Sequence, residues 1–173
     1  MITISSAKGI RAPLSRAALV VLGQAVLRKM PILKHGVEVS LVSMSEIKKL
    51  NKTYRGKNRS TDVLSFSFSH HDQSQVPEGF KLAGQMYLSP DVIRDQARRF
   101  KISGKAEFAR MFVHGLLHCA GLDHMVESEA RSMFTLQEKI VRDTLKKLSI
   151  SAGEIPHTLT DSYFREFFVF PQS

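Results

Sequence analysis

The stretch from His114 to His124 constrains the fold more than any other part of the sequence, because it predicts a helix that ends at a defined residue. It reads His-Gly-Leu-Leu-His-Cys-Ala-Gly-Leu-Asp-His. An α-helix turns about 100° per residue, so His114 and His118 lie on one face, one turn apart. Gly121 ends the helix by taking a left-handed conformation. The chain then folds back and brings His124 toward the same point.

Three neutral imidazoles at this spacing are a ligand set typical of zinc. Three protein ligands leave a fourth position for water, whose pKa bound zinc lowers toward about 7. The stretch therefore predicts one hydrolytic zinc ion per chain, held by His114, His118 and His124. One alternative is that the histidines are polar surface residues or hydrogen-bonded core residues. Another is that they hold a structural zinc. A structural zinc usually has four ligands, rich in cysteine.

The neighbours of the histidines sharpen this interpretation. Cys119 follows His118 by about 100° of helix rotation, so we expect it to point away as a small buried apolar residue. Asp123 is expected to orient a ligand or cap the helix rather than bind zinc. The pattern resembles that of metzincin peptidases, which place a glutamate directly after the first histidine as general base. Gly115 stands there and accepts no proton, which removes the peptidase mechanism.

Periodicity predicts helices and strands in one chain. Strand patterns cover residues 37–42, 63–68 and 82–88, with another short strand possible near 2–4. In the second of these, Leu64, Phe66 and Phe68 point one way and Ser65 and Ser67 the other. Helical patterns cover residues 13–30, about 105–120 and about 128–148. Two further helices begin at Ser43, with a capping-box glutamate at 46, and at Ser89-Pro90-Asp91. We expect Ile47, Leu50 and Tyr54 on one side of the former.

These elements predict an α+β (α/β-type) single domain: a small mixed four-stranded sheet packed with about five helices, and the zinc site at the end of a central helix. The domain is expected to span residues 1–148. Residues 149–173 form a tail that holds four of the eleven phenylalanines. We expect the tail to pack on the same domain, while a partner or dimer contact is the alternative.

Charge and composition narrow the class of partner and the compartment. Lys and Arg outnumber Asp and Glu by 25 to 16, a net charge of +9. This surplus favours nucleic acid or an anionic surface as partner, although a solvated basic surface is as good an explanation. The single cysteine excludes an internal disulfide, which fits a reducing compartment, and no apolar run reaches the roughly 20 residues of a membrane span, so no transmembrane segment is expected. The first 37 residues contain no acidic residue, a composition that organelle transit peptides share.

Three blocks together resemble the YbeY family of endoribonucleases. They are the histidine stretch, the segment Tyr54-Arg55-Gly-Lys followed by Thr61-Asp62-Val63-Leu64-Ser65-Phe66, and Leu82-Ala83-Gly84 opening a strand. The resemblance covers roughly residues 35–148. One position departs from the family, because Gln85 stands where an acidic residue usually follows the strand glycine.

The resemblance implies a single-strand-specific metallo-endoribonuclease with one zinc held by three histidines. It also implies a role in maturing the 3′ end of small-subunit (16S) ribosomal RNA and in ribosome quality control, mostly in the bacterial cytoplasm. The family's ligands carry over to His114, His118 and His124, and its important arginine to Arg55. The implied partners are single-stranded RNA and the small ribosomal subunit, with no membrane. The oligomeric state stays open.

The residues themselves agree with phosphodiester chemistry. We expect His114 and Arg55 to act at the reaction centre, since a guanidinium matches the geometry of a phosphate. Lys57, Arg59, Arg94 and Arg98 are candidates for tracking the RNA backbone, each with a solvated surface charge as the alternative. His70 and His71 are expected to be loop residues. The rival functions are a non-catalytic ribosome-associated RNA-binding protein with structural zinc, and a hydrolase of peptides or small molecules.

Overall fold

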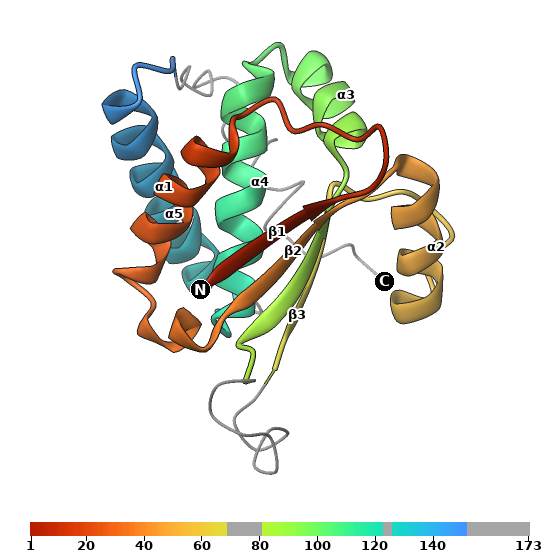
Figure 1. Cartoon of the computed structure of the whole chain (residues 1–173), viewed down its shortest axis with the longest axis horizontal. Helices are drawn as coiled ribbons and strands as arrows, with labels where there is room; N and C mark the ends of the chain where they lie inside the picture. The colour runs from red at the N-terminus through yellow and green to blue at the C-terminus, as the bar shows by residue number, and fades with distance from the viewer. Residues whose placement is uncertain (69–80, 123–125, 152–173) are drawn as a thin grey trace.

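A four-stranded mixed sheet forms one layer of the protein in the computed structural model, which describes residues 1–68, 81–122 and 126–151 (Figure 1). Its strands are β1 (Ile2–Ser6), β2 (Val37–Leu41), β3 (Val63–Ser67) and β4 (Gly84–Leu88), in the order β1-β2-β4-β3. β1, β2 and β4 run parallel, and β3 is antiparallel to β4. The predicted mixed sheet is confirmed, including the short first strand.

Five α-helices are present within the described part of the chain, as expected. They are α1 (Arg16–Leu27), α2 (Met44–Arg55), α3 (Pro90–Phe100), α4 (Gly104–Cys119) and α5 (Glu127–Lys147), with a 3-10 helix, η1 (Pro31–His35), after α1. Figure 1 shows α1, α4 and α5 on one side of the sheet and α2 on the other. No helix in the described ranges is long and apolar enough to span a bilayer.

Serine caps start three of these helices. Ser15, Ser43 and Ser103 accept hydrogen bonds from the backbone N–H groups of Ala18, Glu46 and Ala106, at 3.2, 3.2 and 3.4 Å. Ser89 precedes Pro90 as predicted, but its hydroxyl makes no capping bond and is buried without a partner in the described structure. α3 therefore starts on the fixed φ of Pro90 and the acidic Asp91.

α4 is the central helix and packs against α1, α3, α5, β3 and β4. Two glycines permit its close approach to the sheet. A Cβ at Gly115 would lie 2.7 Å from Met86 Sδ and 3.0 Å from a methyl of Val63. A Cβ at Gly84 would lie 2.4 Å from the Phe66 carbonyl oxygen and 2.9 Å from Cys119 Cβ. The end of α4 that carries the histidines is thus held directly against β3 and β4.

α2 is mostly solvated and buries only Ile47 and Asn51. The seven-residue spacing puts Tyr54 on the same side of α2 as Ile47, as expected. Tyr54 is nevertheless 60% exposed, and its ring meets Phe66 edge-on at 5.1 Å. Gly56 ends α2 with φ +68°. Asn51 Nδ2 then donates to the Arg59 carbonyl at 2.8 Å, which fixes the basic turn against the helix.

The tail cannot be compared with its prediction, since residues 152–173 lie outside the described residues. Its packing on the domain, and the division into residues 1–148 and 149–173, stay predictions.

Candidate metal centre

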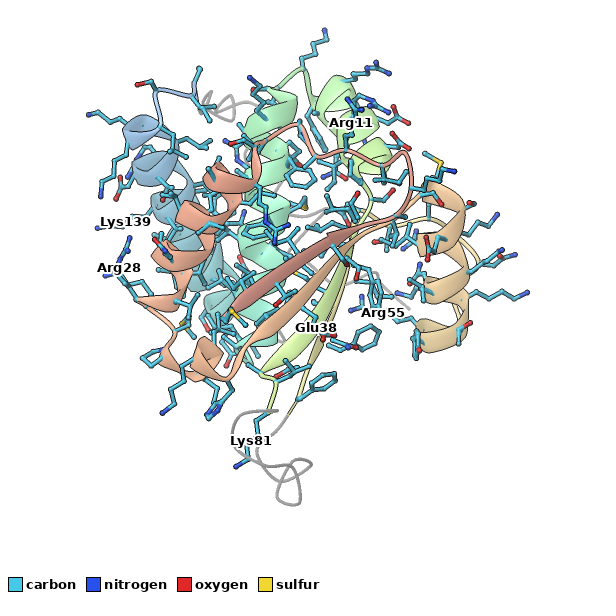
Figure 2. The ribbon with its side chains drawn as sticks, viewed as in Figure 1. Arg11, Arg28, Glu38, Arg55, Lys81 and Lys139 are labelled. Atoms are coloured by element: carbon cyan, nitrogen blue, oxygen red, sulfur yellow. The ribbon has the colours of Figure 1, made fainter. Side chains whose placement is uncertain are left out.

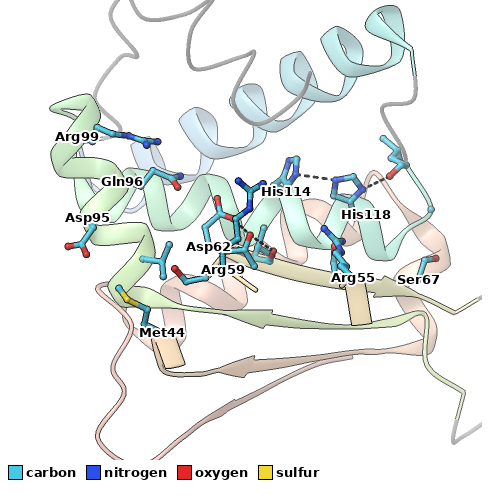
Figure 3. A pocket seen from close by; sticks show the side chains of 17 residues that line it. Met44, Arg55, Arg59, Asp62, Ser67, Asp95, Gln96, Arg99, His114 and His118 are labelled. Carbon is cyan, nitrogen blue, oxygen red and sulfur yellow. Dashed lines mark hydrogen bonds between the residues drawn. The ribbon is translucent and has the colours of Figure 1, made fainter. Parts of the chain in front are cut away.

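A pocket of about 960 Å³ opens where α4 meets β3, α3 and the turn after α2 (Figure 3). Its wall combines basic, acidic and hydroxyl side chains with the two histidines of α4. The lining residues are Met44, Arg55, Arg59, Ser60, Thr61, Asp62, Val63, Ser65, Ser67, Val92, Asp95, Gln96, Arg99, His114, His118, Gly121 and Leu122.

His114 and His118 face each other at the end of this pocket, as their spacing predicts. Their Nε2 atoms are 3.1 Å apart, and their rings meet edge to face at 4.5 Å between centroids. Gly121, with φ +85°, ends the helix as expected. This turn brings the Leu122 carbonyl back to His118 Nδ1 at 2.9 Å.

The partners of the two Nδ1 atoms fix the tautomers. His114 Nδ1 meets Gln137 Oε1 at 3.1 Å, and His118 Nδ1 meets the Leu122 carbonyl. Carbonyl oxygens only accept, so each Nδ1 donates a hydrogen, and in a neutral ring Nε2 then carries a lone pair directed at the other histidine. Two lone pairs at 3.1 Å repel unless a cation lies between them.

Zinc suits this arrangement. Two nitrogen ligands of one tetrahedral zinc lie about 3.3 Å apart when each Zn–N bond is about 2.0–2.1 Å. The 3.1 Å separation of the Nε2 atoms is close to that value. His124 and Asp123 lie outside the described residues, as do His70 and His71. Among the described residues, no group of three His, Cys, Asp or Glu side chains gathers at one point.

The predicted basic residues divide into two groups. Arg55 and Arg59 line the pocket, and Figure 3 draws both guanidinium groups on its histidine side. Lys57 is exposed and outside the pocket lining. Arg94 and Arg98 also lie outside it, in exposed ion pairs with Asp91 and Asp95 of their own helix. The structure therefore brings two of the five predicted cations to the histidines.

The pocket also contains residues that the sequence analysis did not select. α3 contributes Val92, Asp95, Gln96 and Arg99, which share one face because their spacing follows the helical repeat. That spacing was readable, but nothing in it showed which face of α3 meets α4. Ser65 and Ser67 also line the pocket, on the side of β3 opposite Leu64, as the alternation predicts.

Burial changes the acid–base behaviour of two neighbouring groups. Loss of solvent raises the pKa of Asp62 above its ordinary value, against the opposing hydrogen bonds from Val63 N–H at 2.7 Å and the Thr61 hydroxyl at 3.1 Å. Burial also raises the pKa of the Cys119 thiol to about 12. Cys119 packs beside Gly84, so the prediction of a small buried residue is confirmed.

Gln85 lies on the far face of the sheet from the histidines. Its neighbour Met86 points toward α4, so the alternation of β4 turns Gln85 the other way, and its Nε2 donates to Glu38 Oε2 at 2.6 Å. Figure 2 shows Glu38 and Arg55 on the side of the sheet that α2 covers. The missing carboxylate at position 85 therefore concerns the face of the sheet on which α2 lies rather than the face that meets α4.

Comparisons with known proteins all point to one family. The family model described as Endoribonuclease YbeY matches residues 8–145. A relative named Endoribonuclease YbeY from Bacillus licheniformis is 38% identical over 109 residues, which cover 61% of this chain and 69% of the relative. A relative of the same name from Thermotoga maritima is 37% identical over 108 residues, 62% of this chain and 66% of the relative. The solution structure of TM1509 from Thermotoga maritima aligns with TM-score 0.58 at 30% identity, covering 86% of this chain and 92% of that one.

Proposed function

Because this chain belongs to the YbeY family of endoribonucleases, we propose that it is a zinc-dependent endoribonuclease specific for single-stranded RNA. Its proposed role is the maturation of the 3′ end of 16S ribosomal RNA and ribosome quality control, in the cytoplasm and in contact with the small ribosomal subunit. The names of the relatives support the nuclease activity, and the net charge of +9 supports a polyanionic substrate.

One observation carries the proposal: two imidazoles bring their Nε2 atoms within 3.1 Å of each other in a pocket lined by arginines. A bare metal site accounts for the histidines alone, and a bare basic groove accounts for the arginines alone. Their combination fits metal-assisted cleavage of a phosphodiester.

The proposed ligands are His114, His118 and His124. When bound, zinc supplies an activated water and a positive charge beside the scissile phosphate. Arg55 and Arg59 donate to the phosphate oxygens and stabilise the charge that develops on them. Ser65 offers a hydroxyl donor along the same wall, whereas the Ser67 hydroxyl already donates to the Cys119 carbonyl at 3.2 Å. Lys57, Arg94 and Arg98 remain candidates for binding phosphates of the RNA backbone outside the pocket. Arg94 and Arg98 already form exposed ion pairs with Asp91 and Asp95.

The test is His114→Ala, with His35→Ala as control because His35 lies in η1, outside the pocket lining. We expect His114→Ala to lose both zinc and cleavage of a labelled single-stranded RNA, and His35→Ala to keep both. Wild-type cleavage by a zinc-free His114→Ala protein would disprove the proposal.

The same assay distinguishes the proposed nuclease from the rival function. A non-catalytic RNA-binding protein with structural zinc gives tight, salt-sensitive RNA binding with no product, and chelation lowers its melting temperature without changing any turnover. Multiple turnover by wild type that stops on chelation excludes this rival.

A further inference from the structure

A single buried amide lies behind His114. Gln137 is fully buried on α5, on the face that also buries Met133, Ile140 and Val141. Burying an amide among apolar side chains costs free energy unless its polar atoms are hydrogen-bonded. Both ends of Gln137 are bonded: Oε1 meets His114 Nδ1 at 3.1 Å, and Nε2 donates to Glu138 Oε1 at 3.2 Å.

Glu138 determines which way the amide points. An ionised carboxylate only accepts, so Gln137 must turn its NH₂ group to Glu138 and its carbonyl to His114. Glu138 is itself held, because Arg110 Nε donates to both of its oxygens at 3.1 Å. Arg110 is 2% exposed and lies 3.7 Å from the fully buried Glu107 on its other side.

The polar chain continues to the opposite wall of the pocket. Glu107 Oε1 accepts from Gln96 Nε2 at 2.6 Å, and Gln96 lines the pocket together with Asp62 and His114. A buried ion pair adds little net stability compared with apolar packing. Fold stability alone is therefore a poor explanation for this series of buried polar contacts.

We propose that Gln137 is the positioning residue for His114. Its Oε1 keeps the hydrogen on Nδ1, which turns the Nε2 lone pair toward the point shared with His118 and so sets the metal affinity. Arg110 and Glu138 act through Gln137 by fixing its orientation. Gln137 contacts neither substrate nor metal. This inference rests on the proposed zinc site.

The test compares Gln137→Met with Thr144→Val. The first removes the acceptor and keeps the length of the side chain. The second alters another buried polar residue on the same helix, and Thr144 does not line the pocket. Zinc affinity, measured by competition with a chromophoric chelator, is expected to fall about 10- to 100-fold in Gln137→Met and to stay unchanged in Thr144→Val.

A second measurement needs no metal. In the zinc-free wild-type protein, ¹H–¹⁵N correlation of the imidazole rings is expected to find His114 protonated on Nδ1, and Gln137→Met is expected to lose this preference. If Gln137→Met fails to fold, Glu138→Ala replaces it, because Glu138 is a quarter exposed. It is expected to weaken zinc binding in the same direction.

The outcomes separate the inference from the site on which it rests. A wild-type protein that binds zinc, with Gln137→Met of equal affinity, overturns the positioning role and leaves the zinc site intact. Zinc-free wild-type His114 protonated on Nε2 overturns it as well. A wild-type protein that binds no zinc overturns both.

Discussion

Gly115 occupies the position where peptidases with a similar histidine pattern carry their general base. The structure gives this glycine a packing role, because it faces Val63 and Met86 where α4 crosses the sheet. A side chain here would point into the sheet and away from the face that carries His114. The position therefore excludes the peptidase mechanism for two reasons, chemical and steric.

Gly115→Val is expected to destabilise the protein by about 1–3 kcal/mol, since the added atoms overlap Met86 and Val63 in a filled core. Chemical denaturation measures this loss. Gly104→Ala on the same helix is the control, because a Cβ there meets nothing within 4 Å in the described structure. Equal stabilities of the two variants would contradict the packing role.

Asp62 gives a pH-dependent prediction. Its pKa is raised in the folded state, so between about pH 4 and that raised value the folded protein holds the proton more tightly than the unfolded chain. The free energy of unfolding therefore falls as pH rises through this range. Asp62→Asn keeps an oxygen for Val63 N–H and removes the proton, so its stability is expected to fall less.

Urea denaturation of both proteins from about pH 4 to pH 7 checks this, because the difference between the curves isolates Asp62 from other titrating groups. An identical fall in wild type and Asp62→Asn would show that the burial of Asp62 has no energetic consequence.

At the scale of elements, α3 carries arginines on two faces, one toward the pocket and one toward solvent. Arg99 shares a face with Val92, Asp95 and Gln96 and lines the pocket, whereas Arg98 is exposed beside Asp95. Arg99→Ala is expected to weaken binding of single-stranded RNA and to reduce the salt dependence of binding by about one phosphate contact. The matched change Arg98→Ala is expected to alter both much less.

Titrations with labelled RNA at several salt concentrations give both quantities. A larger loss for Arg98→Ala than for Arg99→Ala would place the RNA on the other face of α3.

The elements also show what the sequence can and cannot predict. The bounds of α4 and α5 follow from periodicity and terminators, since Ser103 caps α4 and Gly121 ends it. The buried side of α5, Gln137 included, follows in the same way. The partner of Gln137 does not, because His114 belongs to another helix and only packing brings them together. Sharing a side with Ile47 likewise does not tell whether Tyr54 is buried, because α2 buries only Ile47 and Asn51 and leaves Tyr54 60% exposed.

At the scale of the whole molecule, fold class was predictable and strand order was not. Alternating helix and strand patterns predict a mixed sheet with helices, but the order β1-β2-β4-β3 depends on pairing between distant segments. The histidine pair was predictable because four residues span one helical turn. The pocket around it was not, since its wall comes from α2, β3, α3 and α4 together.

Zinc binding should also be visible in the stability of the whole protein. A ligand that binds only the folded state adds about 2.7 kcal/mol to the free energy of unfolding at 100 times its dissociation constant. Wild type is therefore expected to melt at a higher temperature with zinc than with chelator, as calorimetry can measure. His118→Ala is expected to melt at the same temperature in both, and a zinc-dependent shift in that variant would contradict a site at His118.

The contact between Gln137 and His114 has a consequence for searches by motif. The histidine spacing resides in one helix, so a short string captures it and retrieves any helix able to offer two imidazoles to a metal. Gln137, which we propose orients the first imidazole, belongs to α5, and the arginines proposed to bind phosphate lie at the end of α2 and in the turn after it. Grafting the string onto another scaffold would transfer the ligands without their orientation, and such a protein would hold a metal without the means to use it on RNA.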